Sequence, residues 1–170
     1  CSLVFEAETE EDDVMNRPPR DPAEPLFSRA MIVWSLLQGA LAFGLVAAIF
    51  VVALNRGMPV DEVRALTFFA LIMSIVALIL VNRSTSASIL KAIRRPNRAL
   101  AIVLPLVVLM LAATLLIPFI SKLFRFGPLH ADDLMLTFGA GVVVLVVLEV
   151  LKPLWRMTFG RERTDAVLNC

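Results

Sequence analysis

The feature that most constrains this chain is an uncharged apolar run from Met31 to Leu54. At ~1.5 Å of rise per residue the run is ~36 Å long as an α-helix, and the hydrocarbon core of a bilayer is ~30 Å thick. Only helices and closed barrels satisfy every backbone polar group inside lipid. Because the run does not alternate polar and apolar residues, a barrel strand is excluded. The run therefore predicts a transmembrane helix.

Three further apolar runs follow, and we expect an all-α integral membrane protein with four transmembrane helices. The expected spans are about 31–54, 63–82, 98–120 and 134–151, within a transmembrane domain over 31–156. Hydrophobic residues make up 59% of the chain, against ~45–50% in soluble domains. The alternative, a soluble helical bundle, would interrupt these runs with charge every turn or two. Residues 1–30 are expected to be a juxtamembrane loop, and residues 157–170 a polar tail.

The two cysteines lie at the two ends of the chain, Cys1 and Cys170, and form neither a metal-binding spacing nor a disulfide framework. The first segment is acidic, so it lacks the basic and apolar regions of a signal peptide. A first residue other than Met suggests a piece of a longer polypeptide.

The juxtamembrane segment combines carboxylates with prolines. Six acidic residues lie between Glu6 and Asp13, and paired carboxylates raise the question of acid–base or metal chemistry. A solvated acidic turn is the favoured reading, because nothing apolar lies nearby to shift a pKa. The following stretch 18–25 contains four prolines, which forbid a regular helix and favour a stiff, extended path.

Three polar residues of the spans are the candidates for an ion path: Gln38, Ser74 and Glu149. For Gln38, a hydrogen bond to a neighbouring helix is favoured over a place in a substrate path. The Ser74 hydroxyl is expected to bond to a carbonyl of its own helix, as is that of Thr67. Carboxylates in membrane spans are often functional, but Lys152 lies three residues after Glu149 on the same face, which favours an ion pair.

Glycines and prolines suggest how the spans pack. Gly39 and Gly44, with several alanines, give the first span a face of small residues, and Gly139 and Gly141 in the fourth span also allow close approach. Pro105 and Pro118 both lie within the expected third span, and we predict that each proline kinks its helix.

Some residues near the span ends are candidate ligands or anchors. His130 is the only histidine; beside Asp132 and Asp133 it is a candidate metal ligand, but a solvated loop residue is the favoured reading. Trp155 is expected to anchor the fourth span at the membrane interface.

The positive charges predict how the chain is oriented. Three Lys and Arg residues lie in 1–30, five in 83–98 and four from 152 onward, while the 55–64 and 121–133 connections carry two each. The positive-inside rule therefore places both chain ends in the cytoplasm of a multi-pass protein of the cell membrane. The basic 83–98 loop is read as a topology signal, because nucleic-acid binding would need a folded basic domain.

Residues 1–29 contain the string Phe5-Glu-Ala-Glu followed by Asp13-Val-Met-Asn-Arg-Pro-Pro-Arg-Asp-Pro22, directly before a membrane helix. This string resembles the cytoplasmic loop between the sixth and seventh membrane helices of cation-transporting P-type ATPases, of the calcium-pump-like type. Arg64, Thr67-Phe68 and Asn82-Arg83-Ser84 resemble the family's eighth helix. The match covers the whole chain in order, from this loop through helices seven to ten.

The resemblance implies a division of labour. Helices seven to ten of the family act largely as a buttress, while the phosphorylated aspartate, the nucleotide domain and most ion ligands belong to parts that this chain does not contain. ATP and Mg would therefore be cofactors of the parent alone, and its N-terminal part, the transported cation and the lipid bilayer would be the partners. The loop residues Asp13, Met15, Arg17, Pro18, Pro19 and Arg20 would couple the phosphorylation domain to the membrane.

Calcium pumps of the muscle type also use a carboxylate midway along the eighth helix. This chain has Ser74 and Ile75 in that region and no acid within 63–82, so the resemblance does not identify the ion. The leading hypothesis is the C-terminal transmembrane part of an ATP-driven cation pump, with no catalytic, cofactor or metal site of its own. The alternative is a free-standing four-span membrane protein with a structural or accessory role.

Overall fold

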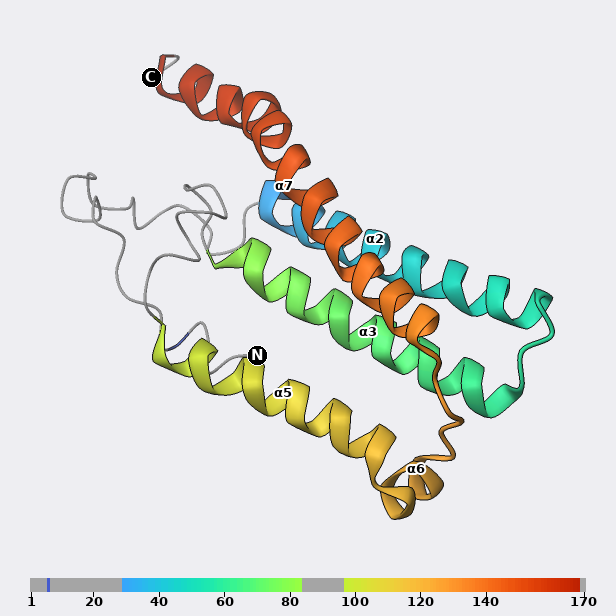
Figure 1. Ribbon diagram of the computed structural model, residues 1–170. Coiled ribbons are helices and arrows are strands. Elements are labelled where there is room, and N and C mark those ends of the chain that lie inside the picture. The colour runs from blue at the N-terminus through green and yellow to red at the C-terminus, as the bar shows by residue number, and fades with distance from the viewer. Residues whose placement is uncertain (1–5, 7–28, 84–96, 169–170) are drawn as a thin grey trace.

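The computed structural model describes residue 6, residues 29–83 and residues 97–168, with the backbone alone for 156 and 158–168. All regular secondary structure among these residues is helical, as the sequence predicts (Figure 1): α2 (Arg29–Asn55), α3 (Val60–Asn82), α5 (Arg98–Leu116), α6 (Pro118–Phe124) and α7 (Ala131–Leu168). Within the described ranges, four helices are long and apolar enough to span a membrane, namely α2, α3, α5 and the first part of α7, Ala131–Trp155.

Helix α3 is the centre of the arrangement. Helices α2 and α7 pack against it, and α5 lies on the other side of α3 from α7 in Figure 1. Six of the nine buried residues of α3 recur every three or four positions: Val63, Leu66, Ala70, Ser74, Ala77 and Val81. This spacing forms one continuous stripe along a helix, and the stripe packs against Ala140, Val144 and Leu148 of α7.

Helix α2 contacts the bundle through a different face from the one that its glycines suggest. Its buried residues are Gln38, Ala42, Val46, Ile49 and Ala53. Both Gly39 and Gly44 are exposed, and a Cβ added to either would meet nothing within 4 Å. Of the small-residue face expected for the first span, Ala42 is therefore part of the packing face, but the two glycines lie outside it among the described residues.

The third apolar run is broken into two helices at Pro118, where the sequence predicted a kink within one span over 98–120. Helix α5 ends at Leu116, Ile117 is extended at φ −97° and ψ 108°, and α6 begins with Pro118. Proline lacks a backbone N–H and disfavours helical geometry in the residue before it. Pro118 therefore starts a new helix at the position that best tolerates proline, and only Pro105 lies inside α5 as expected.

The fourth helix continues beyond the end expected for its span, at about residue 151. It passes through Pro153 and ends at Leu168, so most of the segment expected to be a polar tail is helical. The residues after Pro153 include Arg, Glu, Ala and Leu, which are good helix formers. A polar composition marks where the membrane span ends, but it does not end the helix.

Candidate functional site

Two amide side chains join α2 to α3. Gln38 Nε2 donates to Asn82 Oδ1 at 3.0 Å, and Asn82 Nδ2 donates to Gln38 Oε1 at 3.0 Å. Asn82 Nδ2 also donates to the Leu78 carbonyl at 2.9 Å. Gln38 is 6% exposed, so the pair satisfies polar groups that would be costly in lipid. The predicted interhelical hydrogen bond of Gln38 is confirmed, and its role in an ion path stays a prediction.

The buried hydroxyls of the spans are bonded to their own helices. Ser74 Oγ donates to the Ala70 carbonyl at 2.8 Å, and Thr67 Oγ1 donates to the Val63 carbonyl at 2.7 Å, as the sequence suggested. Ser74 is fully buried, and it lies eight residues from Asn82, ~12 Å along α3. Ser74 therefore lies at a different depth in the bundle from the Gln38–Asn82 pair.

Glu149 forms the predicted ion pair with Lys152, with 3.0 Å between Glu149 Oε2 and Lys152 Nζ. Both side chains are largely buried near the same end of the bundle as the amide pair. Trp155 lies one turn further along α7, where its ring is 5.3 Å from that of Trp34 on α2. The tryptophan therefore packs against α2 as well as being near the end of the apolar span, and this contact had no signal in the sequence.

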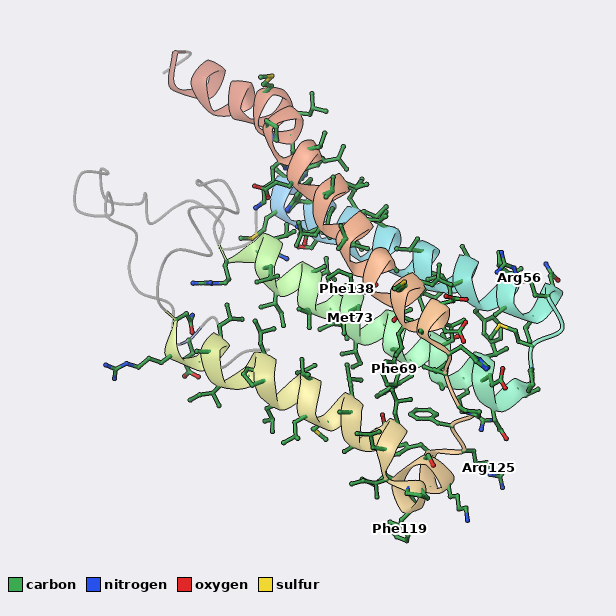
Figure 2. The ribbon with its side chains drawn as sticks, viewed as in Figure 1. Arg56, Phe69, Met73, Phe119, Arg125 and Phe138 are labelled. Carbon is green, nitrogen blue, oxygen red and sulfur yellow. The ribbon has the colours of Figure 1, made fainter. Side chains whose placement is uncertain are left out.

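Helices α3 and α7 approach each other closely at Gly141. A Cβ built on Gly141 would lie 3.1 Å from both the Cβ and the carbonyl oxygen of Met73. Met73 and Phe138 lie in this region in Figure 2. Gly141 is therefore the small residue that lets α7 approach the backbone of α3, as predicted. The same prediction for Gly139 is wrong within the described bundle, because a Cβ there would meet nothing within 4 Å.

The opposite end of the bundle is closed by the connection between α6 and α7. Arg64 of α3 forms an ion pair with Asp61 at 3.1 Å, and its Nη1 also donates to the Arg125 carbonyl at 2.9 Å. The Gly127 N–H donates to the Asp61 carbonyl at 2.9 Å. Arg125 has a left-handed conformation, with φ 52°. These bonds fix the connection to the first turn of α3.

His130 is an exposed residue at the start of α7. Its backbone N–H donates to Asp133 Oδ2 at 3.1 Å, and its Nδ1 lies 3.7 Å from the same oxygen. This bond, from the backbone N–H of the residue before the helix to the side chain three residues later, is one of the two hydrogen bonds of a capping box. No group of three potential metal ligands occurs among the residues that the structure describes.

The structure does not bring the three ion-path candidates together. Gln38 bonds to α3, Ser74 bonds to its own helix, and Glu149 pairs with Lys152 within α7. The predicted coupling residues Asp13, Met15, Arg17, Pro18, Pro19 and Arg20 lie outside the described residues. Two of these roles were not predicted from the sequence. One is Asn82 as the partner of Gln38, although an amide at the end of an apolar run was a signal for it. The other is the N-cap of α5, where Asn97 Oδ1 accepts a hydrogen bond from the Leu100 N–H at 2.9 Å.

The described side chains thus hold helices together, with polar groups that are bonded within or between the spans. A search of curated proteins found no match to the chain. A comparison with protein families matched residues 1–154 to the family described as "Cation transporting ATPase, C-terminus". The match covers nearly the whole chain, including the four apolar helices and the loop before them. The chain belongs to this family, as the C-terminal membrane region of a cation-transporting ATPase.

Proposed function

We propose that this chain supports ion translocation as the fixed membrane scaffold of an ATP-driven cation pump. In this proposal, the N-terminal part of the parent polypeptide binds ATP with Mg and supplies most of the cation ligands. The helices of this chain provide a rigid surface against which the moving helices of the parent work.

The observation that carries the proposal is the tight packing of α3 against α7. The buried stripe of α3 is continuous over the length of the helix, and Gly141 of α7 lies against the backbone of Met73. Two helices packed at this distance cannot slide past each other without separating, because interiors are close-packed and do not deform continuously. The hydrogen bonds of Gln38 with Asn82 add α2 to the same unit.

A disulfide across the α3–α7 contact tests whether this unit stays fixed during transport. Cysteines replace Met73 and Gly141 in the parent polypeptide, because the Cβ atoms of these positions are 3.1 Å apart and disulfides need ~3.5–4.5 Å, a shift of a few tenths of an ångström. Cys1 and Cys170 are changed to Ser, and the single Met73→Cys variant is the control. The proposal predicts the same cation transport per ATP before and after oxidation. Transport that is lost on oxidation and restored on reduction would contradict it.

The proline-rich stretch before α2 is the proposed coupling element. In sequence, Pro18 and Pro19 favour a stiff, extended path, and a stiff segment would transmit a push from the phosphorylation domain better than a flexible one. Replacing both prolines by Gly in the parent should reduce the amount of cation transported per ATP hydrolysed. An unchanged ratio would remove the strut from the proposal and leave the scaffold in place.

We also propose that both chain ends face the ATP-bearing side of the membrane. The support is the unequal distribution of Lys and Arg, since the connections that would share that side carry most of them. The transported cation is best identified by measuring which cation stimulates ATP hydrolysis by the parent.

A further inference from the structure

An apolar groove of about 480 Å³ lies between α3, α5 and α6. Its walls include Phe68 and Ile72 of α3, Met110 and Thr114 of α5, and Leu123 and Phe124 of α6. The one hydroxyl in this lining, that of Thr114, donates to the Leu111 carbonyl at 2.7 Å. Thr114 therefore has no free donor for a polar ligand, and the groove suits a hydrocarbon.

The volume of the groove fits one acyl chain. A methylene group is about as large as a water molecule, which occupies ~30 Å³. The groove of 480 Å³ therefore holds roughly sixteen methylene groups. The groove is also continuous with the membrane surface of the protein, because only 11% of the apolar window of α5 is buried. A lipid chain can therefore enter from the side without crossing a polar region.

The α6 end of the groove carries positive charge. Lys122 and Arg125 are both exposed, and they flank the lining residues Leu123 and Phe124. Within the described part of the chain, the ion pairs include neither the Lys122 amine nor the Arg125 guanidinium. The hydrogen bond from Arg64 to Arg125 ends on the backbone carbonyl of Arg125 and not on its side chain. Figure 2 shows Arg125 at this end of the molecule, with Phe119 pointing away from the bundle.

We propose that this groove is a binding site for one anionic phospholipid, distinct from the surrounding bulk lipid. One acyl chain lies between α3 and α5, and the phosphate lies at α6, within reach of Lys122 and Arg125. An anionic headgroup is favoured because each Lys or Arg near a membrane surface attracts anionic lipid. The inference goes beyond the proposed scaffold role, since it assigns to the chain a ligand that the role does not require.

Native mass spectrometry of the full 170-residue chain tests the site. The chain is purified in detergent with equal amounts of phosphatidylglycerol and phosphatidylcholine, and the lipid that survives detergent removal is identified. We expect one phosphatidylglycerol per chain, with a preference of roughly thirtyfold from the two cations. Lys122→Gln and Arg125→Gln should each lower this preference roughly fivefold, whereas Arg56→Gln, which removes a cation outside the groove, should leave it unchanged.

The acyl part of the site is tested by filling the groove. Ala113 lines it, so Ala113→Trp should abolish retention of the lipid. Leu109→Trp is the control, because Leu109 is on the same helix, 66% exposed and outside the lining. Circular dichroism checks that each variant is folded. If Ala113→Trp does not fold, Thr114→Phe is a second variant that fills the groove.

Three results would overturn the proposal. One is equal retention of lipid by the groove-filling variant and the Leu109→Trp control. Another is equal retention of the two lipids by the unmodified chain. The third is the detection of a dimer of the unmodified chain that the groove-filling variant does not form, which would assign the groove to a second copy of the chain.

Discussion

The contact between Gly141 and Met73 gives the sharpest prediction about stability. In Gly141→Ala, the new Cβ would lie 3.1 Å from the Met73 Cβ and carbonyl oxygen and 3.3 Å from its carbonyl carbon. Two of these atoms are backbone, so they cannot rotate away, and overpacking of this kind costs ~1–3 kcal/mol. Alanine gains ~1 kcal/mol over glycine from helix propensity. The net change at this position is a loss of ~0–2 kcal/mol.

Gly139 is the matched control, two residues earlier in the same helix. A Cβ there meets nothing within 4 Å, so Gly139→Ala should keep the propensity gain of ~1 kcal/mol. The two variants should therefore differ by ~1–3 kcal/mol in the free energy of unfolding.

The measurement is reversible unfolding of the purified chain in mixed lipid–detergent micelles, by titration with sodium dodecyl sulfate and far-ultraviolet circular dichroism. Equal free energies for the two variants, or a more stable Gly141→Ala, would refute the reasoning. Either result would mean that α3 and α7 are not packed backbone against backbone at this point.

Three further predictions concern the polar contacts. Gln38→Leu and Asn82→Leu should each cost ~1–3 kcal/mol in the same assay, because each removes both hydrogen bonds between the two amides. A double-mutant cycle should show coupling of ~0.6–1.7 kcal/mol, and strict additivity would argue against the pair. In Gly127→Ala, the new Cβ would lie 2.7 Å from backbone and side-chain atoms of α3, so the 125–130 connection would have to move away from the helix. Amide hydrogen exchange in residues 125–130 should therefore become faster, and unaltered exchange would count against this contact. Glu149→Gln should destabilise the chain more than Glu149→Gln with Lys152→Met, since the single change leaves a largely buried ammonium without its carboxylate; a larger loss in the double variant would exclude the ion pair.

Much of the architecture could be predicted from the chain, because length and apolarity suffice to identify a membrane span. The same holds for contacts within one helix: the ion pair of Glu149 with Lys152 and the hydroxyl bond of Ser74 follow from spacing alone. The break at Ile117 was also within reach, because Pro118 restricts the residue before it.

Contacts between helices could not be predicted, because they depend on rotation and depth. Gly39 and Gly141 look alike as small residues in apolar runs, but only Gly141 faces another helix of the described bundle. The pairing of Gln38 with Asn82 and the ring contact of Trp34 with Trp155 depend on α2 running antiparallel to α3 and α7. The groove between α3, α5 and α6 depends on the break before Pro118, which turns α6 across its end.

The layout across the membrane is the claim on which the scaffold and the coupling loop both depend. Labelling with a membrane-impermeant maleimide tests it, in chains whose Cys1 and Cys170 are changed to Ser. Single cysteines replace Arg56, in the turn between α2 and α3, and Arg98, at the start of α5; both residues are exposed. The account predicts that the cysteine at 56 is labelled in intact cells and that the cysteine at 98 is labelled only after lysis. Labelling of both from one side, or the reverse pattern, would contradict it.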